Sequence, residues 1–137
     1  NGTDVLVELY GRIAPTAHDV VDGSTMDELL WSPVDGANPI AWLVWHLARV
    51  EDEHLGEAFG EVQLWVDGDW AASFGLPPDP HNTGYGHGPD EVDAVRPASA
   101  EALLGYVDAV AARTRRLLEG LEDGALDRVV DDSYDPR

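Results

Sequence analysis

Cysteine is absent from this 137-residue sequence, and its absence excludes several kinds of chemistry. Without cysteine, the chain can form no disulfide, no thiolate metal site and no cysteine nucleophile. A chain without disulfides suits the reducing cytoplasm, where thiols stay reduced. We therefore expect a cytoplasmic protein.

Positive charge is scarce as well. Lysine is absent, and eight arginines face 27 acidic residues, which gives a formal net charge of −19. A field of this sign repels the phosphates of nucleic acids and the headgroups of anionic membranes. We expect neither a nucleic-acid partner nor a membrane partner. The lack of lysine, beside abundant alanine, glycine, valine and aspartate, points to a GC-rich bacterial genome as the source.

The sequence also has no long apolar run and no recognisable leader. No stretch approaches the roughly 18 apolar residues of a membrane-spanning helix. Residues 1–4 lead directly into a helical pattern rather than into a signal peptide. The apolar content of 44% is ample for one hydrophobic core, and the length fits one domain over residues 1–137.

Three segments show the 3.6-residue hydrophobic period of amphipathic helices, and the first covers residues 4–22. Pro15 should kink or split this helix, because proline removes a backbone hydrogen bond. A capping box, Thr25-Met26-Asp27-Glu28, then predicts one short turn of helix. The last long segment begins at a Ser99 cap and should run to about Glu119.

The second segment has the clearest helical pattern. Asn38 is predicted as its N-cap, Pro39 as its first residue and Gly60 as its stop. The predicted buried stripe consists of Ile40, Leu43, Val44, Leu47, Val50, His54, Leu55 and Ala58. A second stripe along one flank consists of Trp42, His46, Arg49, Glu53 and Glu57.

A long connection, residues 61–98, separates the last two helices and holds most of the prolines and many of the glycines. Short helical turns are expected near residues 69–74 and 89–95. A connection of this length in a small domain is usually functional. Its aromatic residues favour packing against the helices rather than a free loop.

The helical periods and the scarcity of strand signals predict an all-α helical bundle. Bundles usually close with four helices, whereas the tail, residues 122–137, is acidic and offers no closing element. We therefore expect a fourth helix to be missing from this chain. Three helices alone would expose an apolar groove, which swapping or dimerisation could cover.

Several stretches resemble one known family. GANPIAWLVWHLARVEDEHL (residues 36–55) resembles the second helix of DinB-like proteins, in their actinobacterial branch of unknown function. FGLPPDPHNTGYGHGPDEVDAVR (residues 74–96) and LLGYVDAVAARTRRLLEGL (residues 103–121) are similar to the same branch. The WHLARVEDEH segment is the most specific of these matches.

The resemblance implies a four-helix bundle with a long crossover between helices two and three. It also implies a divalent metal, zinc or nickel, held by a histidine of helix two that matches His46. The other ligands would come from the fourth helix. Some relatives use bacillithiol or mycothiol as cosubstrate, and one is a mycothiol-dependent maleylpyruvate isomerase. The resemblance thus favours a metal-dependent thiol transferase or isomerase.

The residues themselves leave the role of His46 open. It lies at the border of the predicted core, where it could be one of the three ligands of a catalytic zinc or a histidine bonded to a neighbouring carboxylate. Glu53 could be a ligand, a partner of His46 or a solvated acid. Glu51-Asp52-Glu53-His54 contains half of a di-iron motif, but no second copy exists, so His54 is predicted as a core histidine.

The remaining histidines and aromatics carry weaker signals. His81 and His87 could close over a site as a lid, although surface positions are the simpler expectation; His18 is expected to be exposed. The run Gly84-Tyr85-Gly86-His87-Gly88 lacks the dinucleotide-binding spacing. Trp42 and Trp45 could pack under the long connection, line a pocket or form a dimer contact.

Two functions of different classes therefore remain open. One is a metal-dependent enzyme that uses His46 and a low-molecular-weight thiol. The other is a non-catalytic helical module that binds a small ligand or dimerises. The sequence predicts no catalytic or cofactor-binding residue beyond the metal ligand His46.

Overall fold

The computed structural model describes residues 2–32 and 37–120, and all regular structure in these ranges is helical. The all-α prediction is confirmed. The helices are α1 (Gly2–Gly11), α2 (Ile13–Asp22), α3 (Met26–Leu30), α4 (Ile40–Phe59), α5 (Leu64–Asp67), α6 (Trp70–Ser73), α7 (Pro89–Ala94) and α8 (Ala100–Glu119). The predictions for the tail, residues 122–137, and for a fourth helix concern residues outside these ranges.

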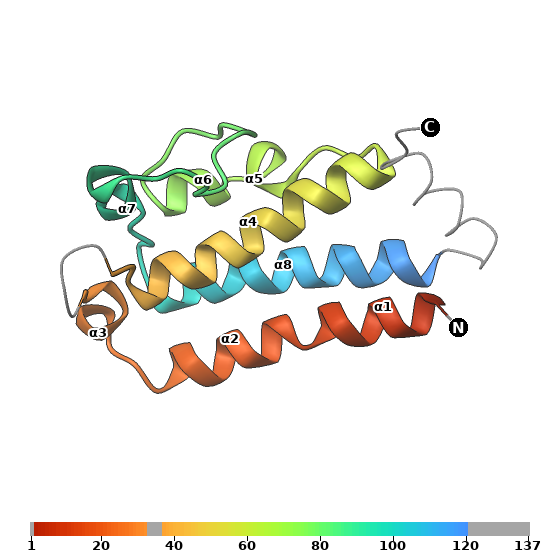
Figure 1. Ribbon diagram of the computed structural model, residues 1–137, viewed down its shortest axis with the longest axis horizontal. Helices are drawn as coiled ribbons and strands as arrows, with labels where there is room; N and C mark the ends of the chain where they lie inside the picture. Colours follow the sequence, from red (N-terminus) through yellow and green to blue (C-terminus); the bar gives the residue numbers. More distant parts are fainter. Residues whose placement is uncertain (1, 33–36, 121–137) are drawn as a thin grey trace.

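Proline splits the first predicted helix, as expected. The break between α1 and α2 falls at Arg12, three residues before Pro15. A proline ring clashes with the carbonyl four residues earlier, which here belongs to Gly11. The two helices therefore follow one another as a bent rod (Figure 1).

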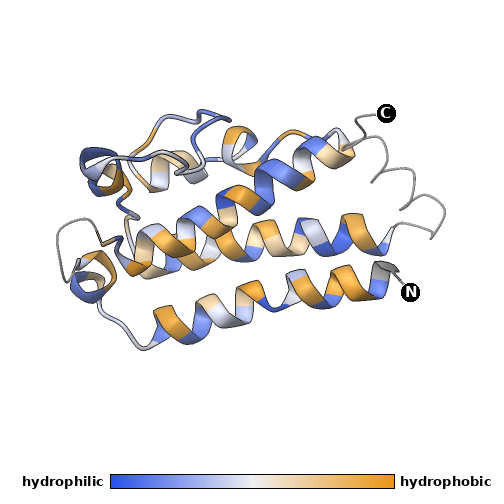
Figure 2. Cartoon of the chain, viewed as in Figure 1, coloured by the Kyte–Doolittle hydropathy of each residue, from blue (hydrophilic) through white to orange (hydrophobic). Residues whose placement is uncertain are grey.

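Helix α8 lies between the other two long rods, α4 and α1–α2, and contacts both (Figure 1). Figure 2 shows hydrophobic residues on the facing sides of these helices. Fully buried apolar side chains come from all three rods and include Val21 of α2, Trp45 of α4, and Leu103, Tyr106 and Val110 of α8. Every large contact between rods thus passes through α8.

The ends of the helices follow local signals. The capping box of α3 is confirmed, because Thr25 accepts the Glu28 amide and Glu28 accepts the Thr25 amide. Ser99 caps α8 by accepting the Ala102 amide. Gly60 ends α4 with a φ of +67°. The cap of α4 is Pro39 rather than Asn38, so that boundary prediction was wrong by one residue.

The buried face of α4 differs from the predicted stripe. Val44 and Leu55 are buried, but Leu43 and Leu47 are 47% and 54% exposed, and His54 is exposed. The prediction of a core histidine at His54 was therefore wrong. Charged residues occupy the interior instead: the buried polar side chains of α4 are Arg49, Glu51 and Asp52. Hydrophobic periodicity missed this face because its charges are neutralised by partners from other elements.

The connection between α4 and α8 packs over one side of these two helices (Figure 1). Two of its helical turns, α6 and α7, were expected, whereas α5 was not. Its aromatic residues form a continuous cluster with α4 and α8: Trp65 lies 5.9 Å from Trp45 and 5.4 Å from Tyr106 between ring centroids. The prediction that the tryptophans of α4 pack under this connection is confirmed.

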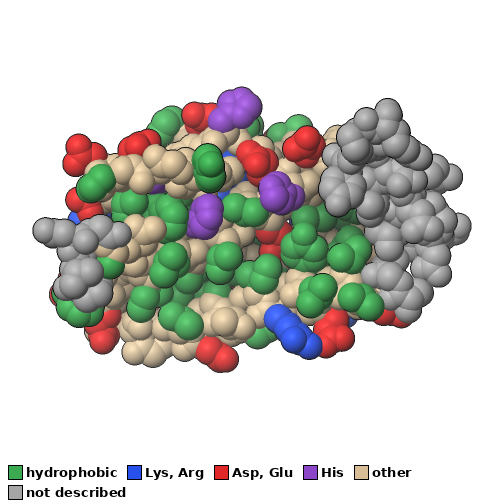
Figure 3. Space-filling model, in the orientation of Figure 1, with side chains coloured by type: hydrophobic (Ala, Val, Ile, Leu, Met, Phe, Trp, Pro, Cys, Tyr) green, Lys and Arg blue, Asp and Glu red, His purple; other side chains and the backbone are tan. Residues whose placement is uncertain are grey.

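A face of the molecule remains apolar on the outside. Figure 3 shows hydrophobic side chains gathered along α4 and the α1–α2 rod, with histidines beside them. The large exposed apolar residues of these helices are Val5, Leu9, Val20, Leu43 and Leu47. We call these five residues the open apolar face. Within the described part of the chain, no helix is both long and apolar enough to cross a membrane.

Candidate functional site

His46 lies on α4 at the edge of the core, with its side chain half-buried. Its ring stacks on that of Trp42, with 4.8 Å between the centroids and 15° between the planes. Its Nδ1 atom lies 2.5 Å from the carbonyl oxygen of Thr83 in the connection between α4 and α8. Stacking and the hydrogen bond together fix the plane and the direction of the imidazole.

The partner of Nδ1 determines the tautomer of His46. A carbonyl oxygen can only accept a hydrogen bond, so Nδ1 must carry the hydrogen. In a neutral ring, the lone pair is then on Nε2, and none of the described residues bonds this atom. The alternative of a border histidine bonded to a neighbouring carboxylate does not hold, because the partner is a backbone carbonyl.

The loop around Gly84 comes unusually close to this histidine. Gly84 has a φ of +94°, which favours glycine. A Cβ atom at Gly84 would lie 2.8 Å from Cζ2 of Trp42, 3.0 Å from Nδ1 of His46 and 3.0 Å from Cζ3 of Trp45. Both the backbone conformation and the available space therefore require glycine here. The glycine-rich run that lacked dinucleotide spacing is the backbone that covers His46.

His87 fastens the other end of this loop. Nε1 of Trp42 donates to Nδ1 of His87 at 3.1 Å, and Nε2 of His87 lies 2.8 Å from Oδ1 of Asn82. The His87 ring also stacks on Trp45 at 5.8 Å. His87 is therefore neither a free surface histidine nor an open lid, because it pins the loop to α4. His81 is exposed.

Arg49 binds the backbone at the beginning of the loop. Its Nε donates to the carbonyl of Asn82 at 2.8 Å, and its Nη2 donates to that of Pro80 at 3.2 Å. The guanidinium lies 5.1 Å from the centre of the Trp65 ring, and the side chain is fully buried. A planar group with several fixed donors suits two carbonyls at once.

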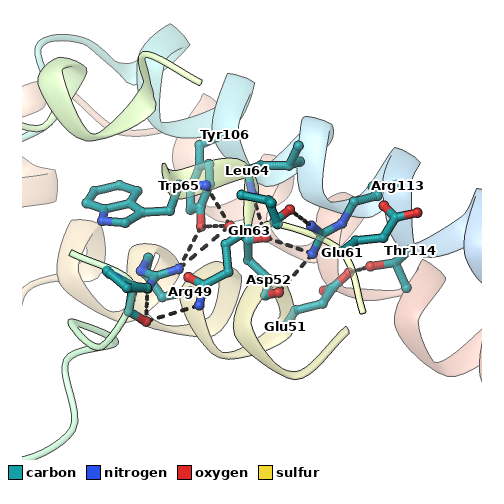
Figure 4. A network of polar contacts seen from close by, with 12 residues as sticks. Arg49, Glu51, Asp52, Glu61, Gln63, Leu64, Trp65, Tyr106, Arg113 and Thr114 are labelled. Carbon is teal, nitrogen blue, oxygen red and sulfur yellow. Dashed lines mark hydrogen bonds and ion pairs between the residues drawn. The ribbon is translucent and has the colours of Figure 1, made fainter. Parts of the chain in front are cut away.

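Asp52 is the hub of the polar network in Figure 4. Its fully buried carboxylate accepts the amides of Leu64 and Trp65, each at 2.9 Å, and so anchors the first residues of α5. It also accepts the hydroxyl of Tyr106 at 2.7 Å. Burial raises the pKa of this tyrosine, with the charge of Asp52 as a second cause, so the hydroxyl stays a donor.

Two arginines balance the charge of Asp52. Nη2 of Arg113 lies 2.7 Å from one carboxylate oxygen, and Nη1 of Arg49 lies 3.6 Å from the other. Arg113 also donates to the carbonyls of Asp52 at 2.8 Å and Val62 at 3.0 Å. The main role of Arg113 is therefore buried pairing with Asp52.

Glu51 is buried beside this network but has fewer hydrogen-bond partners than Asp52. Its carboxylate accepts the hydroxyl of Thr114 at 2.6 Å. Burial raises the pKa of Glu51, although the Thr114 hydrogen bond and the charge of Arg113 oppose the shift. Its neighbour Glu53 is half-buried and is not among the contacts of His46.

His18 on α2 forms a separate polar contact. Its Nε2 donates to Asp108 of α8 at 2.8 Å, and the pKa of His18 is raised, first by this hydrogen bond. The histidine is partly exposed, so the sequence indicated its position but not its partner.

The described residues bring His46 together with aromatic rings and a backbone carbonyl, not with further ligands. Within residues 2–32 and 37–120, no three histidine, aspartate or glutamate side chains are grouped so that they could hold a metal ion. The metal ligand role of His46 therefore stays a prediction. The sequence analysis did not predict the roles of Arg49, Asp52 and Gly84. Only Gly84 had a signal in the sequence, since it belongs to the glycine-rich run.

Comparisons with known proteins point to one family. The family pattern described as the DinB superfamily matches residues 12–137. No curated protein matches the chain. A solved structure, described as a conserved protein from Enterococcus faecalis, is 24% identical with a TM-score of 0.79, and the match covers 89% of this chain and 72% of that one. This likeness shows the same helical fold.

Proposed function

Because the chain belongs to the DinB superfamily, we propose that it binds a divalent metal ion, zinc or nickel, through Nε2 of His46. The geometry of His46 is the observation that supports this proposal. Metal-binding histidines almost always donate their other ring N–H to a carbonyl, a carboxylate or water. His46 has this arrangement, with Nδ1 on the Thr83 carbonyl and Nε2 free of the described residues.

The described residues fit one ligand position of such a site. Imidazole nitrogen is a good donor to zinc and nickel. A catalytic zinc takes three protein ligands and leaves one position open, so the proposal requires further ligands from outside the described residues. A bound divalent metal would supply Lewis acidity and lower the pKa of a coordinated thiol.

His46 lies at the edge of a core built of aromatic rings. Trp42 and Trp45 are buried beside the histidine and exclude water from one side of its ring. Nε2 lies on the side without a described partner. We propose, by analogy with thiol-using members of the superfamily, a transferase or isomerase that uses a low-molecular-weight thiol of the mycothiol type, in the cytoplasm of a bacterium.

Metal analysis of matched variants tests the metal proposal. Purified protein is titrated with zinc and with nickel by calorimetry, and bound metal is counted by elemental analysis. We expect about one ion per chain, and at least about a 10-fold loss of affinity in His46→Ala, because a ligand is removed. His54→Ala, an exposed histidine of the same helix, should bind as the wild type does. An affinity for both metals in His46→Ala equal to that of the wild type would refute the proposal.

A second function is favoured by the open apolar face. Five large apolar residues on α1, α2 and α4 are more than 40% exposed, and exposed apolar patches mark interaction sites. A non-catalytic module that dimerises or binds an apolar ligand through this face would explain their exposure. It predicts a molecular mass that rises with protein concentration in light scattering and no stoichiometric metal.

A further inference from the structure

The loop over His46 has a role beyond covering the core. We infer that residues 80–87 are a positioning device for His46: the Thr83 carbonyl selects the Nδ1–H tautomer and turns Nε2 outward as the donor atom. The inference rests on the proposed function, because the donor atom matters only if His46 binds a metal. The tautomer itself is a property of the metal-free chain. It assigns positioning roles to Gly84 and Arg49.

Three side chains of α4 fasten this loop at successive points. Arg49 holds the carbonyls of Pro80 and Asn82, His46 holds that of Thr83, and Trp42 holds the ring of His87. The three residues are spaced by three and four positions, so they share one side of the helix. The order of contacts along the loop runs opposite to the order along the helix, so the loop runs antiparallel to α4. We call residues 80–87 the strap.

The strap is fixed independently of any ligand at His46. Arg49, which holds the strap, is paired with Asp52 and lies against Trp65, and all three residues are fully buried. Asp52 in turn bonds the backbone of α5 and the hydroxyl of Tyr106. The Thr83 carbonyl is therefore set in place before a ligand arrives. Such preorganisation lowers the cost of ordering a ligand histidine on binding.

Gly84 is the residue that allows the carbonyl to approach. Its Cα lies so close to α4 that an added methyl group would meet Trp42, Trp45 and Nδ1 of His46 within 2.8 to 3.0 Å. These atoms belong to rings that are held by stacking and burial, so the loop would have to move away. Moving it lengthens the bond from Nδ1 to Thr83 and removes the preference for one tautomer.

Gly86 offers a matched control. It lies in the same loop and has a similar φ of +78°, but a Cβ atom there would have no neighbour within 4 Å. Gly84→Ala and Gly86→Ala therefore impose comparable backbone strain. Only Gly84→Ala also pushes the loop away from His46.

The experiment is long-range proton–nitrogen NMR of the imidazole rings, recorded without metal at about pH 9, above the range in which histidines titrate. The signals of His46 are assigned by their loss in His46→Gln. We expect a hydrogen on Nδ1 and a lone pair on Nε2 in the wild type and in Gly86→Ala. Gly84→Ala should show a mixture of tautomers and bind zinc about 10–100-fold more weakly than Gly86→Ala.

The wild-type spectrum alone can overturn the inference. A hydrogen on Nε2, or the same tautomer ratio in Gly84→Ala and the wild type, would show that the loop does not select the donor atom. This result differs from failure of the proposed function. If the wild type has the expected tautomer and no zinc binds, the metal proposal fails while the positioning of His46 stands.

Discussion

The two sides of α4 contrast in a way that hydrophobicity does not explain. One side faces α8 and the long connection and contains the buried charged residues Arg49 and Asp52, which have hydrogen-bond partners from distant parts of the chain (Figure 4). The other side carries Leu43 and Leu47, which are apolar and about half exposed. The charges are inside and these leucines are outside, so partners rather than polarity decide what this helix buries.

The contrast also separates two kinds of stability. Buried charges without partners cost several kcal/mol each, so the polar side is stable only while its network is complete. The open apolar face contributes little to the folded monomer, because its leucines leave much of their surface in water. The polar side therefore fixes the fold, and the apolar side remains available for contacts.

The largest effect is expected at the hub of the polar side. Asp52→Asn keeps the shape of the side chain but removes the negative charge that Arg49 and Arg113 share. Breaking such a buried pair costs about 3–5 kcal/mol. The free energy of unfolding, measured in urea, should fall by this amount. Glu57→Asn, at an exposed site on the same helix, should leave the free energy of unfolding nearly unchanged. Equal losses in both variants would show that the buried network does not stabilise the fold more than an exposed residue does.

A smaller, pH-dependent effect is expected at Glu51. Because burial raises its pKa above the ordinary value of 4.5, the folded chain binds its proton more tightly than the unfolded chain. The resulting stability is fully present below about pH 4.5 and is lost as the pH rises through the folded-state pKa. Glu51→Gln, which stays neutral, should not lose it.

The measurement for Glu51 is the difference in unfolding free energy between Glu51→Gln and the wild type from pH 4 to pH 8. The difference should grow in favour of the variant as the pH rises, because only the wild type has a buried carboxyl group that becomes charged. Glu57→Gln removes an exposed charge of the same helix and serves as the control. A difference that is constant across this range would show that ionisation of Glu51 does not change the stability.

The smallest effect is expected on the open apolar face. Leu47→Ala should lower the free energy of unfolding by less than about 0.5 kcal/mol, as at other exposed sites. Leu55→Ala, on the same helix but only 5% exposed, should lower it by about 2–5 kcal/mol. If the face is a dimer contact, Leu47→Ala should also abolish the concentration-dependent mass. A large loss of monomer stability in Leu47→Ala would mean that this leucine belongs to the core.

Much of the helical framework follows from the sequence because its signals are local. Pro15 breaks the first rod, Thr25 and Glu28 cap α3, Ser99 caps α8, and Gly60 ends α4. Each depends on atoms within about one helical turn, so a sequence pattern contains all the needed information. The all-α class and the resemblance to one family were accessible for the same reason.

The candidate site was only partly accessible. His46 could be named from its segment, but neither its tautomer nor its contact with Thr83 follows from a helical period. Gly84 was visible only as part of a glycine-rich run, and that run has no meaning until it lies on α4. Residues 37 positions apart form the hydrogen bond that gives His46 its direction.

The sequence by itself therefore determined most of the ends of the long helices, and which histidine lies at the border of the core. Only the tertiary structure decided that Arg49, Glu51 and Asp52 are buried, because burial of a charge requires partners such as Tyr106, Arg113 and Thr114. Those partners lie more than 50 positions further along the chain. Pairing across such distances is set by how the helices pack, which no local pattern of side chains encodes.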